Sequence, residues 1–142
     1  TQTVIGLDGR KMSKSYDNTI PLFLPTKKLR KLIMKVVTNS QTIEEVKDPD
    51  KCNVFTLYKL FTSNDQQNIL REKYLAGGMG WGHAKQELFE VMEEMVSPMR
   101  EKYDELMNNK DFIDKLLDEG SEKAQEIASE KMKLVKNILG FK

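Results

Sequence analysis

Hydrophobic residues recur every three or four positions through most of this chain, and this spacing predicts amphipathic α-helices. The first predicted helix covers residues 25–37, with its lysines on the face opposite the apolar residues. A polar stretch over residues 41–53 predicts a loop, and a short apolar helix is expected over 54–62. The Ser-Asn-Asp-Gln segment at 63–66 resembles a capping box, so a third helix should begin there and end at Gly77.

The longest predicted helix follows the glycine-rich segment at residues 77–82. Its apolar stripe is interrupted by Pro98, which should kink the helix or mark a join, and Met95 lies in the middle of the stripe. The stripe consists of Ala84, Leu88, Val91, Met92, Met95, Met99, Tyr103 and Leu106. Two more helices are predicted, over residues 109–120 and 121–140. Since no strand-like alternation follows residue 20, we expect an all-α fold: a helical bundle of five or six helices preceded by an irregular loop.

The composition narrows the classes of protein to which the chain can belong. Hydrophobic residues are 39% and charged residues 32%, which is typical of a soluble, helix-rich protein. No apolar run approaches the roughly 18 residues that a membrane span needs, and no signal-peptide pattern is present. With Cys52 as the single cysteine and His83 as the single histidine, neither an internal disulfide nor a zinc site is expected. We therefore expect no metal site, no membrane association and a cytoplasmic location.

The net charge of +1 conceals a strong asymmetry along the chain. Residues 1–40 hold eight basic and two acidic residues, a charge of +6, whereas residues 41–142 carry −5. A basic first part suits contact with phosphate groups or nucleic acid, and the acidic remainder argues against a surface that binds nucleic acid everywhere.

The candidate chemistry lies in the basic part, in the five residues Lys11-Met12-Ser13-Lys14-Ser15. Two mobile ammonium groups, two hydroxyls and nearby backbone N–H groups can bind phosphate oxygens. Lysines aimed at a departing pyrophosphate would act where charge develops in the transition state. A solvated basic loop is the alternative interpretation of the same residues.

This five-residue word, KMSKS, resembles the second signature of the class I aminoacyl-tRNA synthetases, as do the Leu-Asp-Gly-Arg before it and the Asp-Asn after it. A second resemblance lies at residues 73–85, which look like the tyrosine–glycine–aromatic–glycine–lysine segment of bacterial tryptophanyl-tRNA synthetases. Trp81 stands where that family is expected to have tyrosine, which an aromatic packing role tolerates. Residues 118–124 look like the C-terminal segment of the same family, so the resemblance covers almost the whole chain.

The resemblance implies that this chain is the C-terminal part of a longer enzyme, which we call the parent protein, and it implies a specific activity for that enzyme. The family activates tryptophan with ATP and Mg²⁺, releases pyrophosphate, and then esterifies the 3′ end of tRNA(Trp). Carried onto this sequence, Lys11 and Lys14 become the catalytic phosphate contacts, and the ATP-binding residues become Lys11, Met12, Ser13, Lys14 and Ser15. The parent is expected to be a homodimer.

The resemblance also implies that the helical part receives the anticodon arm of the tRNA and moves during closure. Lys85, Lys123 and Lys131 are the candidate tRNA contacts. A structural bond from Lys85 to a carboxylate or a carbonyl is equally compatible with the sequence, and so is a solvated face for the other two lysines.

One expected feature of the family is missing from this sequence. The first class I signature needs two histidines, and this chain has only His83. We therefore expect residues 1–20 to be the edge of a nucleotide-binding domain, residues 21–142 to be the C-terminal helical domain, and the chain alone to be inactive. A tyrosyl-tRNA synthetase fragment and an independent helical module that binds RNA or protein remain alternatives.

Overall fold

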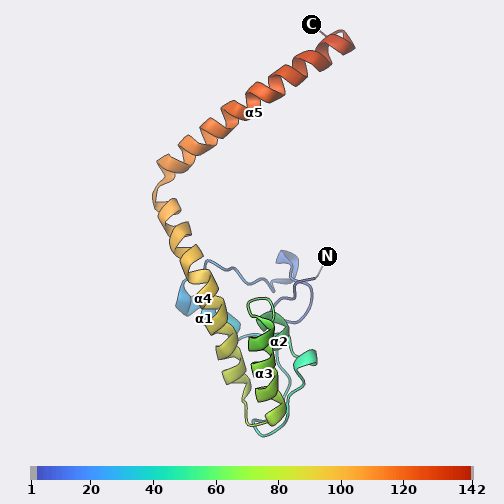
Figure 1. Cartoon of the computed structure of the whole chain (residues 1–142), viewed down its shortest axis with the longest axis vertical. Coiled ribbons are helices and arrows are strands. Elements are labelled where there is room, and N and C mark those ends of the chain that lie inside the picture. The colour runs from blue at the N-terminus through green and yellow to red at the C-terminus, as the bar shows by residue number, and fades with distance from the viewer. Residues whose placement is uncertain (1–2, 142) are drawn as a thin grey trace. The chain divides into compact units, whose positions relative to one another are not determined.

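Five α-helices make up the computed structural model, which describes residues 3–141 (Figure 1). They are α1 (Thr26–Ile33), α2 (Asn53–Tyr58), α3 (Asn64–Ala76), α4 (Trp81–Asn108) and α5 (Lys110–Leu139), with 3-10 turns at Lys14–Tyr16 and Pro49–Lys51. Within residues 3–141 the only β pairing is an isolated bridge between Ile5 and Lys11. The all-α prediction is confirmed.

The chain divides into two compact units, Thr1–Glu101 and Lys102–Lys142. These units do not correspond to the predicted division at residue 20 between the edge of a nucleotide-binding domain and the C-terminal helical domain. That division concerns function, and it stays a prediction. Thr1, Gln2 and Lys142, which belong to the predicted segments, lie outside the described residues. No helix among the described residues is long and apolar enough to cross a membrane.

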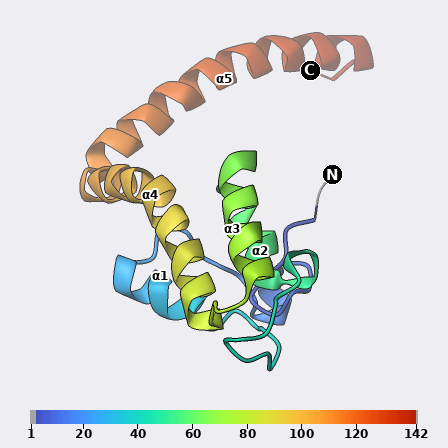
Figure 2. The ribbon, with the colours of Figure 1, turned by 60° about the horizontal axis from the view of Figure 1, so that its bottom comes forward.

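In the first unit, the N-terminal half of α4 lies between α1 on one side and α3 on the other (Figures 1 and 2). The apolar faces of these helices and of α2 enclose one core. Its members with at most 2% exposure include Leu29, Ile33, Val36, Val54, Phe55, Leu57, Leu70, Tyr74, Ala84, Leu88 and Met92. Burial of these side chains is the main stabilisation of the unit, since each large apolar side chain contributes roughly 1.5–3 kcal/mol.

The predicted capping box at the start of α3 is confirmed. The Ser63 hydroxyl accepts a hydrogen bond from the backbone N–H of Gln66, and the Gln66 side chain accepts one from the N–H of Ser63. The first helix, in contrast, ends at Ile33 and not at residue 37. A tight turn over 34–36 breaks the helical period, and it allows the N–H of Val37 to bond the carbonyl of Leu7 at 2.8 Å.

The predicted core stripe of α4 is correct only in its first half. Met92 is 1% exposed, but Met95 is 44% and Met99 is 52% exposed. The buried positions continue at four-residue spacing from Met92 to Val96, and this turns Met95 toward the flank of the helix. The interpretation of Met95 as a core residue was therefore wrong.

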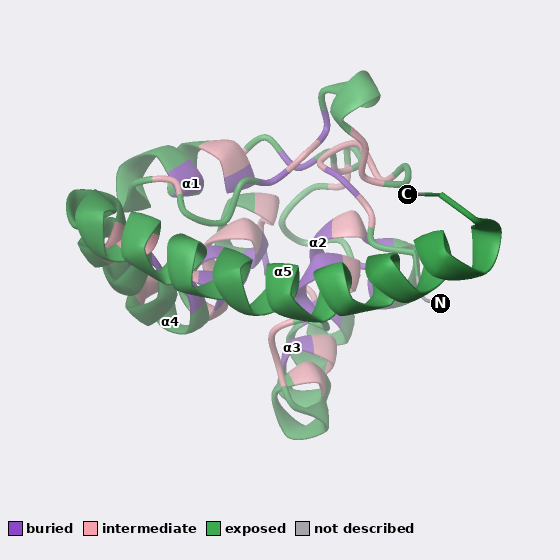
Figure 3. Ribbon diagram, turned by 90° about the horizontal axis from the view of Figure 1, so that it is seen from above, coloured by how far each residue is buried: buried purple, intermediate pink, exposed green. Residues whose placement is uncertain are grey.

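The two predicted helices over 109–120 and 121–140 are one continuous helix, α5, in the structure. Gly120 lies inside it and does not end it, because a helical glycine costs only about 1 kcal/mol relative to alanine. No described residue of α5 is buried, and nearly all of the helix has the colour of exposed residues in Figure 3.

Candidate nucleotide-phosphate site

Asn18 holds the base of the KMSKS loop together. Its Oδ1 accepts a hydrogen bond from the N–H of Ser13 at 2.8 Å. Its Nδ2 donates to Asp8 Oδ1 at 2.8 Å and to the carbonyl of Lys11 at 3.2 Å. Its own carbonyl accepts from the N–H of Leu7 at 3.1 Å. Asn18 is only 2% exposed, so these bonds satisfy a buried amide and fix both ends of the loop.

Two glycines allow the chain to approach this anchor closely. A Cβ on Gly6 would lie 2.4 Å from the carbonyl oxygen of Asn18, which is closer than atoms can pack. Gly9 has a φ of +81°, a conformation that glycine adopts without strain, and a Cβ there would lie 2.5 Å from Asn53 Oδ1. The tight segment before the lysines therefore depends on both residues.

Electrostatics at the base of the loop favour an ionised Asp8. The hydrogen bond from Asn18, and then those from Arg10, lower the pKa of Asp8 to about 2. The Arg10 guanidinium lies 2.6 Å from Asp8 Oδ2 and stands over the Tyr16 ring at 4.8 Å. Because Asp8 compensates the charge of Arg10, the uncompensated positive charge of this segment belongs to Lys11 and Lys14.

Lys11 forms the isolated bridge with Ile5, and Lys14 and Ser15 lie in the 3-10 turn that follows. The side chains of Lys11 and Lys14 are exposed, and neither has a carboxylate partner among residues 3–141. The hydroxyls of Ser13 and Ser15 are hydrogen-bonded to each other at 2.8 Å. The Met12 side chain packs against the core and so attaches the loop to it.

The backbone N–H groups of the loop are largely occupied. The N–H of Met12 donates to the carbonyl of Val4 at 2.9 Å, and the N–H of Ser13 donates to Asn18. The N–H of Ser15 donates to Ser13 Oγ at 3.3 Å. In this conformation the two ammonium groups remain available to an anion, and so does one of the two hydroxyl hydrogens, since the other joins Ser13 to Ser15. A backbone contact from Met12 would require the loop to leave Val4.

The three candidate tRNA contacts lie in different surroundings. Lys85 is partly buried, its Nζ donates to the carbonyl of Met34 at 3.1 Å, and burial lowers its pKa. Lys123 and Lys131 are exposed on α5, in the second unit. Of the two roles that the sequence allows for Lys85, the structure shows the bond to a backbone carbonyl.

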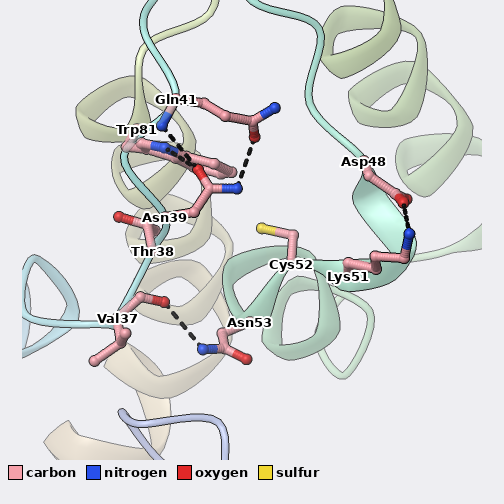
Figure 4. A pocket seen from close by; sticks show the side chains of 9 residues that line it. All are labelled: Val37, Thr38, Asn39, Gln41, Asp48, Lys51, Cys52, Asn53 and Trp81. Atoms are coloured by element: carbon pink, nitrogen blue, oxygen red, sulfur yellow. Dashed lines mark hydrogen bonds and ion pairs between the residues drawn. The ribbon is translucent and has the colours of Figure 1, made fainter.

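A cavity of about 500 Å³ is lined by residues of the segments 37–41 and 48–53 and by Trp81 (Figure 4). Asn39 organises its wall: its Oδ1 accepts from Trp81 Nε1 at 3.1 Å and from the N–H of Gln41 at 3.1 Å. Asn53, at the other wall, donates from Nδ2 to the carbonyl of Val37 at 3.0 Å. This cavity could not be predicted from the sequence, because its walls come from three segments that are far apart along the chain.

Lys47 is a second feature that the sequence analysis missed. Its side chain is fully buried, and its Nζ donates to the carbonyls of Thr42 at 2.8 Å and Glu45 at 3.1 Å. The ammonium also lies 5.2 Å from the centre of the Trp81 ring, a cation–π distance. The two carbonyl bonds close the 41–47 segment on itself, and the ring contact joins it to Trp81 at the start of α4. No group of three or more histidine, cysteine or acidic side chains that could hold a metal ion occurs among the described residues.

The comparisons with known proteins agree with this geometry. Residues 1–97 match the family described as tRNA synthetases class I (W and Y). The chain therefore belongs to this family of class I tRNA synthetases, and the KMSKS loop lies within the matched region. This contradicts the alternative in which the word occurs by chance in an unrelated helical module.

Within the family, the chain is similar along nearly its whole length to tryptophan–tRNA ligases of several bacteria. The chain is 49% identical over 138 residues to the tryptophan–tRNA ligase of Fusobacterium nucleatum, covering 97% of this chain and 42% of that protein. It is 42% identical over 140 residues to the enzyme of Pseudomonas aeruginosa, covering 99% of this chain and 31% of that protein.

A solved structure of tryptophanyl-tRNA synthetase from Campylobacter jejuni, complexed with ADP and tryptophan, matches with a TM-score of 0.94 and 41% identity. The match covers 99% of this chain and 44% of that chain. The chain thus spans less than half the length of each of these relatives.

Proposed function

We propose that this chain supplies the KMSKS loop and the helical tRNA-binding part of a tryptophan–tRNA ligase, which activates tryptophan with ATP and attaches it to tRNA(Trp). The observation that carries the proposal is the pair of exposed ammonium groups, Lys11 and Lys14, on a loop whose base Asn18 fixes. Similarity to tryptophan enzymes along nearly the whole chain supports tryptophan over tyrosine as the amino acid.

In the proposed reaction the tryptophan carboxylate attacks the α-phosphate of ATP, and pyrophosphate leaves. Negative charge grows on the leaving phosphates as the bond to the α-phosphate breaks. Lys11 and Lys14 would stabilise that charge, and Ser13 and Ser15 would donate hydrogen bonds to phosphate oxygens. Met12 would lie near the nucleotide while its side chain keeps the loop on the core.

Mg²⁺ would accompany the phosphates of ATP. Residues near the loop do not fit a metal site held by the protein, because Asp8 already accepts bonds from Asn18 and Arg10.

Lys85, Lys123 and Lys131 remain the proposed tRNA contacts of the helical part. Lys85 would have to exchange the carbonyl of Met34 for an RNA phosphate, whereas the two α5 lysines are already exposed. The proposal includes a cytoplasmic, homodimeric parent enzyme, and it includes the inactivity of this chain alone, since His83 is its single histidine.

The test is tryptophan activation by the parent enzyme that contains this chain. Lys14→Ala should slow adenylate formation about a hundredfold, a loss on the order of 3 kcal/mol, while tryptophan binding stays nearly unchanged. Lys136→Ala, an exposed position on α5, is the matched control and should behave like wild type. Unchanged pre-steady-state adenylate formation in Lys14→Ala would overturn the proposed role. A coding region without a nucleotide-binding domain upstream of Thr1 would overturn the assignment to a parent enzyme.

A further inference from the structure

Helix α1 displays the most concentrated positive charge on the described surface. Residues 18–43 contain five basic residues and no acidic one. Lys27, Lys28 and Lys31 are exposed and lie within about 100° of one another around the axis of α1, opposite the buried Leu29 and Ile33, and the exposed Lys35 lies in the turn that follows the helix. We call these four lysines the α1 basic face. None of their ammonium groups has a carboxylate partner among residues 3–141.

This charge opposes the stability of the helix that carries it. The N-terminal end of a helix has a partial positive charge, so acidic residues are favoured there. The first turn of α1 has no acidic residue, contains Lys27 and Lys28, and has no side-chain cap from Pro25. Lysines placed against the helix dipole, without compensation on their own helix, indicate a role in binding an anion.

Contacts from α4 hold both ends of α1 in place. At the N-terminal end, Thr26 Oγ1 donates to Glu93 Oε1 at 2.7 Å, and Glu93 is bonded by Arg100. At the other end, Lys85 bonds the carbonyl of Met34. Arg30 Nε donates to Gln86 Oε1 at 2.9 Å between these two points. The basic face is therefore presented by a helix that is fixed at three positions.

The lysines of α5 provide a contrast. Over 110–139 that helix has six lysines and seven acidic residues, so its charges largely balance one another. A surface of interspersed charges suits solvation, whereas an uninterrupted basic surface attracts the regularly spaced charges of a phosphate backbone.

We propose that the α1 basic face binds the phosphate backbone of RNA. The inference rests on the proposed function, which makes tRNA the RNA at hand, but it assigns a different surface from the three lysines named above. Lysine contacts to phosphates position an RNA without reading its sequence. The α1 basic face should therefore supply affinity and salt dependence and no base preference.

The experiment measures binding of fluorescently labelled tRNA transcripts to the 142-residue chain. The salt concentration is varied from about 50 to about 200 mM, because the affinity that comes from phosphate contacts falls steeply over this range. One variant changes Lys27, Lys28, Lys31 and Lys35 to glutamine. The matched control changes four other exposed lysines, Lys110, Lys115, Lys133 and Lys136, to glutamine.

The α1 variant should bind at least about tenfold more weakly at low salt, and its plot of log affinity against log salt should be less steep by roughly 0.9 per lost contact. The loss should be the same for tRNA(Trp) and for a tRNA of unrelated sequence. The control should bind like wild type. Because removing lysines from the first turn relieves the opposition to the dipole, the melting temperature of the α1 variant should not fall.

Wild-type affinity in the α1 variant would overturn the inference, and so would an equal loss in the control. A loss confined to tRNA(Trp) would also overturn it, because backbone contacts cannot distinguish sequences. The proposed function is tested separately, by tryptophan activation in the Lys14→Ala variant of the parent enzyme. In that assay the α1 variant of the parent enzyme should activate tryptophan at the wild-type rate.

Discussion

Lys85 of α4 donates from Nζ to the carbonyl oxygen of Met34, 3.1 Å away, just beyond the C-terminal end of α1. Carbonyls at the end of a helix lack partners within the helix, and the dipole makes that end attractive to a cation. The bond therefore compensates the end of α1 and joins it to α4. Burial lowers the pKa of Lys85, which shows what the ammonium loses in hydration at this position.

Replacing Lys85 with methionine should reduce the free energy of unfolding by about 1–2 kcal/mol, because the Met34 carbonyl loses its partner while the aliphatic contacts remain. Lys73→Met is the matched control. Its ammonium pairs with Glu87 at 2.6 Å on an exposed surface, and such pairs contribute at most about 1 kcal/mol. Urea denaturation of the two variants would compare them, and a larger loss in Lys73→Met would contradict the structural role of Lys85.

Gly6→Ala should destabilise the base of the KMSKS loop by about 1–3 kcal/mol, because the new methyl group would lie 2.4 Å from the backbone oxygen of Asn18. Gly120→Ala should do the opposite. Apart from the adjoining backbone of the helix itself, no described atom lies within 4 Å of a Cβ at Gly120, and alanine favours a helix by about 1 kcal/mol over glycine. Thermal unfolding followed by circular dichroism would measure both. A destabilised Gly120→Ala would show that α5 is not continuous through this residue.

Met92→Asp should cost several kcal/mol, because it places an unpaired charge at a position that is 1% exposed. Met95→Asp, three residues away on the same helix, should cost less than about 1 kcal/mol, because Met95 is 44% exposed. A domain of this size has only about 5–15 kcal/mol of stability, so Met92→Asp is expected to unfold or aggregate. Similar melting temperatures for the two variants would contradict the orientation of α4.

The loop base should lose stability in acid. The pKa of Asp8 is about 2 in the folded chain and 3.8 as the ordinary value, so the folded state favours the ionised carboxylate. That contribution is complete above pH 4 and is lost progressively as the pH falls toward 2. The urea midpoint of Asp8→Asn should therefore fall less steeply over this interval than that of wild type. Asp17→Asn, at an exposed position, is the control, and a wild-type slope in Asp8→Asn would contradict the prediction.

Local features of the structure could be predicted well from the sequence. Helical periodicity located the helices, and the Ser63–Gln66 capping box marked the start of α3 because both of its bonds join residues three apart. The KMSKS word and the aromatic–glycine–lysine segment pointed to the synthetase family, to which the chain belongs. Errors occurred where a local signal was weaker than its context, as at Gly120, where glycine alone did not end a helix that both flanking segments favour.

Contacts between distant segments were decided only by the tertiary structure. In the sequence, Asn18 is only the second residue of the Asp-Asn pair that follows the KMSKS word, yet in the structure it is the buried centre of the loop base, because Asp8, Lys11 and Ser13 bond to it. From the sequence, a tRNA contact and a structural bond were equally compatible with Lys85. The structure shows the bond, because the end of α1 lies where the Met34 carbonyl can accept from Lys85 Nζ. An apolar stripe shows only that a helix has a face that can be buried. Met92 and Met95 belong to the same stripe of α4, but only Met92 is buried in the core. Periodicity along a chain determines which residues share a face, while burial depends on what the rest of the fold brings to that face.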